Sequence, residues 1–339
     1  MKNKLFYLLL ILVSDVFIST AQDIHLSQFS QTPLLLNPAS AGIFNGYHRA
    51  VINYKNQWVA MGNAFKTTAA SFDMPFTRGK GAYIGGGISV FRDKAGDSHF
   101  GITQAALSLS GILPMDEHNK VSVGMQVGFA QRSATIDDLQ WGSQYTQQGY
   151  DPSAPSYEVN TINSFVYGDI GAGVFYEFNN SKGTISGKDI FKVNAGVACF
   201  HANQPVQSFF PSSSEHLYRK YVAHVAMRWD IPESKFSFLP SVMYFKQGGS
   251  AESYLGTLIR YRLTNGTKVT GFYTESSILL GCHFRLNDSF TPQVYYEIGN
   301  YAIGFSYDYT TSYFAEGTKS KGGIEVSVKY TNTKDALRK

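Results

Sequence analysis

Charged residues are scarce in this chain. They make up 16% of its 339 residues, against about a quarter in an ordinary globular protein. The formal net charge is only +4 and no dense basic stripe is visible, so a nucleic-acid partner is not expected. Cysteine is scarcer still, with Cys199 and Cys282 as the only two. They could form a disulfide in an exported protein, or they could serve as small buried or lipid-facing hydrophobic residues.

Catalytic and metal-binding signatures are missing from the sequence. It contains no HExxH, no P-loop, no GxSxG and no CxxC, and its eight histidines do not pair at ligand spacing. The stretch Asp93–Asp97 and the pair Asp137-Asp138 could offer calcium ligands, but polar loops account for both of them. We therefore expect neither an enzyme nor a bound cofactor or metal.

Long apolar runs are absent beyond the N-terminus. No stretch there approaches the ~18 apolar residues of a transmembrane helix, so none is predicted. Residues 1–21 instead have the composition of a signal peptide. Lys2 and Lys4 precede the mostly apolar stretch Leu5–Ile18, and small residues follow it. We expect export of the chain and a mature N-terminus at Gln22.

Aromatic residues and glycine are abundant, with 22 Tyr, 25 Phe and 32 Gly. In Tyr301–Tyr309 every odd position is aromatic or Ile and every even position is small or polar, and Ile324–Tyr330 repeats this alternation. Successive side chains of a strand point to opposite faces, so each segment predicts one apolar and one polar face. The apolar face would pack on a core in a soluble sandwich, and would meet lipid in an outer-membrane barrel.

Fourteen segments have this strand-like pattern, and many span 9 to 14 residues. A soluble strand averages about 5–6 residues, whereas a tilted membrane strand needs about 9–11. Strand length, export signal and aromatic content together favour an all-β fold, a transmembrane antiparallel β-barrel of about 14 strands over 47–330. An irregular segment, 22–46, would precede it and a charged tail, 331–339, would follow. The expected strands are 47–57, 64–74, 81–92, 99–112, 119–131, 166–178, 190–201, 217–230, 235–247, 252–262, 276–286, 289–299, 301–310 and 322–330.

The lengths of the links suggest which end of the barrel faces outward. If both ends of the barrel chain lie in the periplasm, the two longest links, 132–165 and 202–216, fall on the outer side. This is the arrangement typical of outer-membrane barrels, which have long external loops and short periplasmic turns. The link 263–275 is longer than a periplasmic turn usually is.

Six charged residues fall on predicted polar strand faces and are expected to line the lumen. An outward charge at the bilayer midplane would cost about 2–4 kcal/mol, which explains the segregation. These side chains could filter a solute, grip a plug or simply pair with one another. His201 and His224 are interpreted as lumen or rim residues. The six lumen charges are Asp169, Glu177, Lys220, Arg228, Arg260 and Arg262.

The segment before the first strand contains a rigid turn, because proline follows Asn37 and glycine follows the Ala-Ser-Ala run. It could plug the lumen, dock on a periplasmic partner or simply lead into the barrel. Trp58 is expected in an interfacial aromatic belt. The candidate plug or partner residues are Asn37, Pro38, Ala39, Ala41, Gly42, Gln57 and Trp58.

An ordered set of short motifs resembles the PorP/SprF family, membrane proteins of the type IX secretion system. Lys55 stands where the family's N-Y-R-N-Q-W run has arginine, and it lacks the planar fork that binds a carboxylate through two hydrogen bonds. The matching pieces are Gln28-Phe29, Asn37–Gly42, Asn53–Trp58, Ser71–Pro75, Gly87 with Asp93–Gly96, His201–Pro205, Gly304–Tyr309 and Gly323–Glu325.

This resemblance implies an outer-membrane accessory of type IX secretion. Such a protein would assist the export or surface anchoring of a large adhesin-like cargo protein, and some members support gliding motility. The implied partners are the secreted cargo, other type IX components and the lipid bilayer. A passive outer-membrane pore for small solutes is the alternative function, and a soluble periplasmic β-sandwich or lectin-like binder is a third.

Overall fold

The computed structural model describes residues 23–58, 65–76, 81–135, 139–158, 164–183, 188–209, 214–264, 274–312 and 315–332. The expected signal peptide, the pair Asp137-Asp138, most of the link 263–275 and most of the C-terminal tail lie outside these residues.

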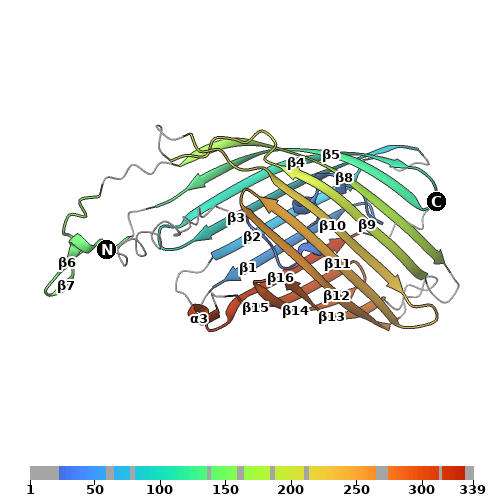
Figure 1. The fold of residues 1–339 in the computed structure, drawn as a ribbon. Helices are drawn as coiled ribbons and strands as arrows, with labels where there is room; N and C mark the ends of the chain where they lie inside the picture. The colour runs from blue at the N-terminus through green and yellow to red at the C-terminus, as the bar shows by residue number, and fades with distance from the viewer. Residues whose placement is uncertain are drawn as a thin grey trace, which may run out of the picture.

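The described chain forms a closed antiparallel barrel of fourteen strands (Figure 1). Neighbouring strands follow chain order, and the ring closes where the first strand pairs with the last over nine residue pairs. Each of the fourteen segments expected from alternation overlaps one barrel strand, so the predicted fold class is confirmed. The barrel strands are β1 (Arg49–Gln57), β2 (Phe65–Pro75), β3 (Tyr83–Ala95), β4 (Phe100–Pro114), β5 (Asn119–Ser133), β8 (Phe165–Gly183), β9 (Lys188–Phe200), β10 (Lys220–Asp230), β11 (Phe236–Gln247), β12 (Ser250–Thr264), β13 (Ser276–Arg285), β14 (Ser289–Ile298), β15 (Tyr301–Thr310) and β16 (Lys321–Thr331).

The barrel has its polar residues inside and its apolar residues outside. Along β5 the outward residues Val123, Met125, Val127 and Phe129 are 53–67% exposed, while the alternate side chains turn inward and are buried. The same holds for β15 and β16, whose alternation separates an exposed aromatic or aliphatic face from buried serine and carboxylate side chains. Such a surface suits contact with lipid rather than water.

The two ends of the barrel differ. At the terminal rim, β1 begins and β16 ends, and the amide of Tyr47 donates a hydrogen bond to the Asn332 carbonyl at 2.9 Å. At the opposite end, the loop rim, lie the short helix α3 (Ala315–Thr318) and a small hairpin of β6 (Tyr145–Thr146) and β7 (Gly149–Tyr150), which stands clear of the barrel (Figure 1). The sequence did not predict this hairpin.

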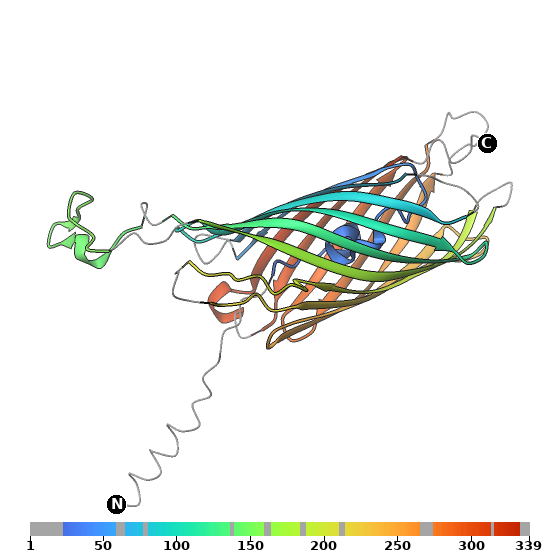
Figure 2. The same ribbon diagram turned by 90° about the horizontal axis from the view of Figure 1, so that it is seen from above.

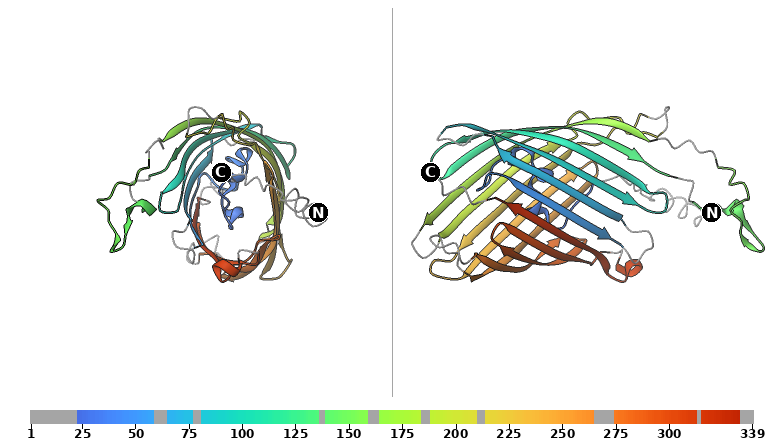
Figure 3. Two further views of the ribbon diagram at one scale, coloured as in Figure 1. Left: turned by 60° about the vertical axis from the view of Figure 1, so that its left-hand side comes forward. Right: turned by 180° about the vertical axis from the view of Figure 1, so that it is seen from behind.

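The N-terminal segment, residues 23–46, runs inside the barrel rather than along its outer surface (Figures 2 and 3). It contains three short helical turns, η1 (Phe29–Gln31), α2 (Pro33–Leu36) and η2 (Pro38–Ser40). Pro33 and Pro38 each occupy the first position of a turn, where the missing N–H is not needed. None of the described helices has the length and apolar content needed to cross a membrane.

The two cysteines are free thiols. Cys199 lies on β9 and Cys282 on β13, with three strands of the ring between them. Both alternate with buried, inward neighbours, so their side chains lie on the outward face.

Candidate functional site in the barrel lumen

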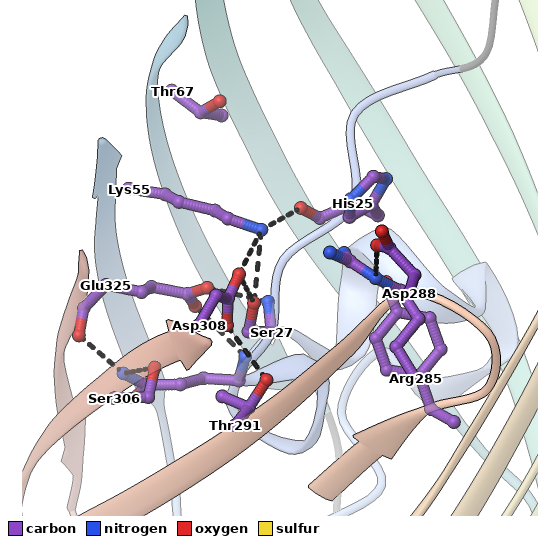
Figure 4. Close-up of polar contacts among 12 residues, drawn as sticks. His25, Ser27, Lys55, Thr67, Arg285, Asp288, Thr291, Ser306, Asp308 and Glu325 are labelled. Atoms are coloured by element: carbon purple, nitrogen blue, oxygen red, sulfur yellow. Dashed lines mark hydrogen bonds and ion pairs between the residues drawn. The ribbon is translucent and has the colours of Figure 1, made fainter. Parts of the chain in front are cut away.

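The candidate site is the interface between the N-terminal segment and the inner wall of the barrel. The centre of this interface is a buried polar network on β1, β14, β15 and β16, next to the seam where the barrel closes (Figure 4). Glu325 is its main acceptor. One carboxylate oxygen accepts the amide of Ser27 at 2.6 Å and the other accepts the amide of Gln28 at 3.2 Å. These two backbone N–H groups of the segment therefore find their hydrogen-bond acceptor in a carboxylate of the barrel wall.

Lys55 and Asp308 complete this network. The ammonium group of Lys55 lies 3.3 Å from an Asp308 carboxylate oxygen and donates to the Ser27 hydroxyl at 3.1 Å and to the His25 carbonyl at 3.2 Å (Figure 4). The Ser27 hydroxyl in turn donates to Asp308 at 2.7 Å. Both charged side chains are at most 3% exposed. A buried charge is tolerated when it is paired and hydrogen-bonded, and here the pair is completed by the inserted segment.

The side chain of Gln28 extends the network along β15 and β16. Its amide nitrogen donates to the Ser306 hydroxyl at 3.1 Å and to the Glu325 carbonyl at 2.9 Å. Its amide oxygen accepts from the Ser327 hydroxyl at 2.5 Å. Both the nitrogen and the oxygen of the Gln28 side-chain amide are therefore hydrogen-bonded to the barrel wall.

Asn37 fixes the middle of the segment to β8 and β9. Its side-chain amide donates to the carbonyls of Val174 at 2.9 Å and Val197 at 3.3 Å, and its oxygen accepts the amide of Ala39, capping η2. Asn37 and Ala39 are completely buried. One side chain therefore binds the wall and holds the next turn in shape.

The rest of this turn is bound by β2, β4 and β5. The carbonyl of Ala39 accepts from the Ser122 hydroxyl at 2.7 Å, and the carbonyl of Ala41 accepts from Ser110 at 2.6 Å. The amide of Gly42 donates to Asp73 at 2.9 Å. Gly42 has a φ of +69°, and a Cβ there would lie 2.7 Å from a backbone carbon of the wall. Glycine is required at this point for both reasons.

Wall glycines allow this close approach. A Cβ on Gly124 of β5 would lie 2.5 Å from the Cα and the amide nitrogen of Ala39, where the backbone cannot yield easily. We expect Gly124→Ala to destabilise the protein by about 1–3 kcal/mol, as overpacking does in a tight core. Urea unfolding in detergent measures this change. The matched control is Gly111→Ala on β4, where a Cβ meets nothing within 4 Å, and an equal loss in both variants would contradict the prediction.

The loop-rim end of the segment is held by a second charged cluster. His201, just after β9, bridges two carboxylates, with Nε2 at 2.6 Å from Asp23 and Nδ1 at 2.8 Å from Asp169. The ammonium group of Lys220 lies 3.6 Å from the same Asp23 carboxylate. Burial would lower the pKa of the imidazole, but the two carboxylates outweigh it and raise the pKa to about 9. Burial likewise opposes ionisation of Asp23, yet His201 and Lys220 hold the pKa of that carboxyl well below its usual range.

This cluster makes the stability of the protein sensitive to alkaline pH. Because the pKa of His201 rises from an ordinary 6.5 to about 9 on folding, the protonated form stabilises the fold fully below about pH 6.5. That contribution is lost as the pH rises through about 9. We expect the melting temperature in detergent to fall between pH 7 and 10, and to fall less in His201→Gln. His118→Gln, in an exposed turn, should behave like the wild type, and identical pH profiles for all three proteins would refute this assignment.

The structure brings some of the candidate residues together and separates others. Asn37, Pro38, Ala39, Ala41 and Gly42 are all buried in the lumen interface. Gln57 ends β1, and Trp58 follows it at the loop rim, where its indole packs edge-on against Phe65 at 5.2 Å. These last two residues are therefore not part of the inserted segment.

The six predicted lumen charges fall into two groups. Asp169 and Lys220 belong to the cluster around Asp23 and so contact the inserted segment directly or through His201. The other four form ion pairs with charged side chains that do not belong to the inserted segment. These are Glu177 with Lys120 and Lys192, Arg228 with Asp230, Arg260 with Glu275 and Glu297, and Arg262 with Asp230 and Glu275. His224 also faces the lumen, with its ring 5.8 Å from that of Phe175.

The residues that bind the segment most strongly were not predicted as site residues. They are Asp23, Ser27, Gln28, Lys55, Asp308 and Glu325, and four of them stand in the family-like motifs. For Lys55, Asp308 and Glu325 the available signal was a polar side chain at an inward strand position, whereas Gln28 precedes the first strand. In the part of the chain that the structure describes, no cluster of three or more His, Cys, Asp and Glu side chains is placed to hold a metal ion.

Comparison with known proteins places this architecture in a family. Among solved structures, the chain is similar in fold to the toluene transporter TbuX of Ralstonia pickettii, with 14% identity, a TM-score of 0.49, and coverage of 89% of this chain and 94% of that one. A second is BamA of Haemophilus ducreyi lacking POTRA domains 1-3, with 11% identity, a TM-score of 0.41, and coverage of 85% and 70%. No curated protein matches the sequence.

A family model covers almost the whole chain. The model described as "Type IX secretion system membrane protein PorP/SprF" matches residues 18–330. This range covers the inserted segment and the fourteen barrel strands, except for the final residue of β16. The resemblance found in the short motifs is thereby confirmed. Together with the closed fourteen-strand barrel, the family match also confirms the expected location in the outer membrane. The chain belongs to the PorP/SprF family of type IX secretion system membrane proteins.

Proposed function

We propose that this barrel is a non-enzymatic accessory of type IX secretion that assists the export or surface anchoring of a large adhesin-like cargo protein. The observation that carries the proposal is the family match over residues 18–330. The lumen geometry supports the accessory role. Buried hydrogen bonds fasten the segment to β1, β2, β4, β5, β8, β9, β14, β15 and β16, and the segment occupies the space that a polypeptide in transit would need.

In this proposal the cargo is held outside the lumen, at the loop rim. The β6–β7 hairpin suits such contact because Tyr145 and Tyr150 lie on it with their rings 5.5 Å apart and exposed to solvent. Tyrosine is a common residue of protein interfaces, where a rigid ring gives contact area at little entropic cost. The remaining partners would be other type IX components and the bilayer.

Deletion of the gene followed by quantitative proteomics of the cell surface tests this function. We expect the loss of one large surface protein from the envelope and its accumulation or degradation inside the cell, with uptake of small solutes unchanged. Re-expression of the wild-type gene should restore it. An unchanged surface proteome, or a general loss of small-solute permeability, would overturn the proposal.

A further inference from the structure

An arc of ten charged side chains, here called the belt, lines the lumen near the terminal rim from β5 through β8 to β16. Strand register connects most of its members. Lys329 pairs with Ala302, Ala302 with Glu297, Glu297 with Ser277, and Ser277 with Arg262. On β12 the row continues from Arg260, which pairs with Ser237, and Ser237 pairs with Asp230. Arg228 pairs with Lys192, and Lys120 pairs with Glu177, whose carboxylate the Lys192 ammonium contacts. The belt consists of Lys120, Lys192, Arg228, Arg260, Arg262 and Lys329 with Glu177, Glu275, Asp230 and Glu297.

Cations outnumber carboxylates in the belt by six to four, so several carboxylates are shared. Glu177 lies 2.6 Å from Lys192 and 3.4 Å from Lys120. Asp230 lies 2.8 Å from Arg228 and 3.7 Å from Arg262. The ion pairs therefore leave the belt with a surplus of positive charge.

Arg260 and Arg262 on β12 each contact two carboxylates, and each still has N–H donors without a hydrogen bond. Arg260 contacts Glu275 at 3.0 Å and Glu297 at 2.8 Å. Arg262 is 3.8 Å from Glu275. Lys329 has no carboxylate within 4 Å among the residues that the structure describes.

Two buried donors of the belt lack an acceptor. Nη1 of Arg260 is buried without any hydrogen bond in the described structure, and the Arg260 side chain is only 6% exposed. Nε of Arg262 is also buried, and its contact with Glu275 at 3.8 Å is too long for a hydrogen bond. Buried charged donors are almost always hydrogen-bonded in folded proteins, so these two groups can accommodate a further acceptor. Both residues lie two apart on β12, on the same inward face.

Solvent reaches the belt despite these buried atoms. Lys120, Lys192 and Arg228 are 23–27% exposed at their side chains. The small residues Ala302, Ser277 and Ser237 alternate with the charged residues along the row. Their short side chains leave space in the lumen beside the charged groups. A ligand that enters at the terminal rim can therefore meet several cations together.

We propose that the belt binds an acidic peptide segment of a partner protein that inserts into the barrel at the terminal rim. The cations are distributed over β5, β9, β10, β12 and β16, so one small anion would meet only neighbouring members. A chain bearing several carboxylates is complementary to the whole arc, and bidentate arginine–carboxylate bonds would use the orphan donors. This inference does not depend on the proposed function, since the belt lies at the opposite end of the barrel from the loop rim.

The test uses the full-length protein in detergent and a fluorescein-labelled peptide of six glutamates, with binding followed by fluorescence anisotropy. We expect binding that weakens with added salt, because the contacts are ionic. Arg262→Gln with Lys329→Gln should weaken it about tenfold, since charged hydrogen bonds are among the strongest that proteins make. Lys329→Gln alone, which breaks no ion pair, should weaken it about threefold.

The control variant, Lys66→Gln with Lys246→Gln, removes the same charge from exposed positions near the loop rim and should leave the affinity unchanged. Equal affinity in all variants, or an equal loss in the control, would overturn the proposal. A peptide of six glutamines should not bind. If inorganic phosphate competes fully and binds as tightly as the glutamate peptide, the belt is a site for small free anions and the peptide proposal fails.

Discussion

Replacing Lys55 with methionine is expected to lower the free energy of unfolding by about 3–5 kcal/mol, because removing one partner of a buried pair leaves the other charge uncompensated. Here that charge is the Asp308 carboxylate, which is 3% exposed and accepts only two hydroxyl bonds, from Ser27 and Thr291, once the ammonium is gone. The change also leaves the His25 carbonyl without its donor. Urea unfolding in detergent, followed by tryptophan fluorescence, measures the effect.

A double-mutant cycle separates the charge effect from a packing effect. Lys55→Met combined with Asp308→Asn should be less destabilised than the single variant, because the second change removes the unpaired charge. Lys55→Arg should be close to wild type, since a guanidinium can reach the same three acceptors and is the residue that the family motif has at this position. If the single and double variants are equally unstable, the loss comes from packing and the ionic explanation is wrong.

Removal of residues 23–44 is expected to open the barrel. The wild-type protein should be electrically silent in a planar bilayer, because the segment is bonded to the wall along most of its length. The deletion variant should give stable open-channel currents, the largest qualitative change expected of any variant described here. This measurement also decides between an accessory barrel and the alternative of a passive pore, which predicts conductance in the wild type.

A second variant covers the possibility that the deletion does not fold. Asp73→Ala with Ser110→Ala and Ser122→Ala removes three of the bonds that hold residues 39–42 to β2, β4 and β5. It should give brief, flickering currents as the turn leaves the wall. The control variant, Asp97→Ala with Ser98→Ala and Ser143→Ala, changes three loop positions and should stay silent. Conductance in the wild type, or silence of a folded deletion variant, would contradict the sealing role.

The barrel could be predicted from the sequence because the alternation that specifies each strand is a local pattern. Each strand repeats with a period of two, and the cost of an outward charge sorts side chains between lumen and lipid. The inward placement of Asp169, Glu177 and Arg260 follows from that rule alone. The β6–β7 hairpin has only two residues in each strand, too few to show any alternation.

The lumen network could not be predicted, because its partners are far apart in the chain. Ser27 and Glu325 are separated by 298 positions and Lys55 and Ser27 by 28, and no local pattern links them. The motifs that suggested the family contained Gln28, Lys55, Asp308 and Glu325, but each was visible only as a short string. The structure explains why these strings occur together. Lys55, Asp308 and Glu325 are wall residues that bind the inserted segment, and Gln28 is a residue of the segment that bonds to Glu325.

The bonds from Ser27 and Gln28 to Glu325 have a consequence for biogenesis. The acceptor belongs to the last strand to be synthesised, while the donors belong to the segment that precedes the first strand. The segment cannot reach its final state until β16 has docked beside β1, so ring closure and threading of the segment must finish as one late step. Contacts between such distant residues form slowly. An assembly intermediate halted before closure should therefore expose residues 23–46 to protease, and protection of this segment would report the completed barrel.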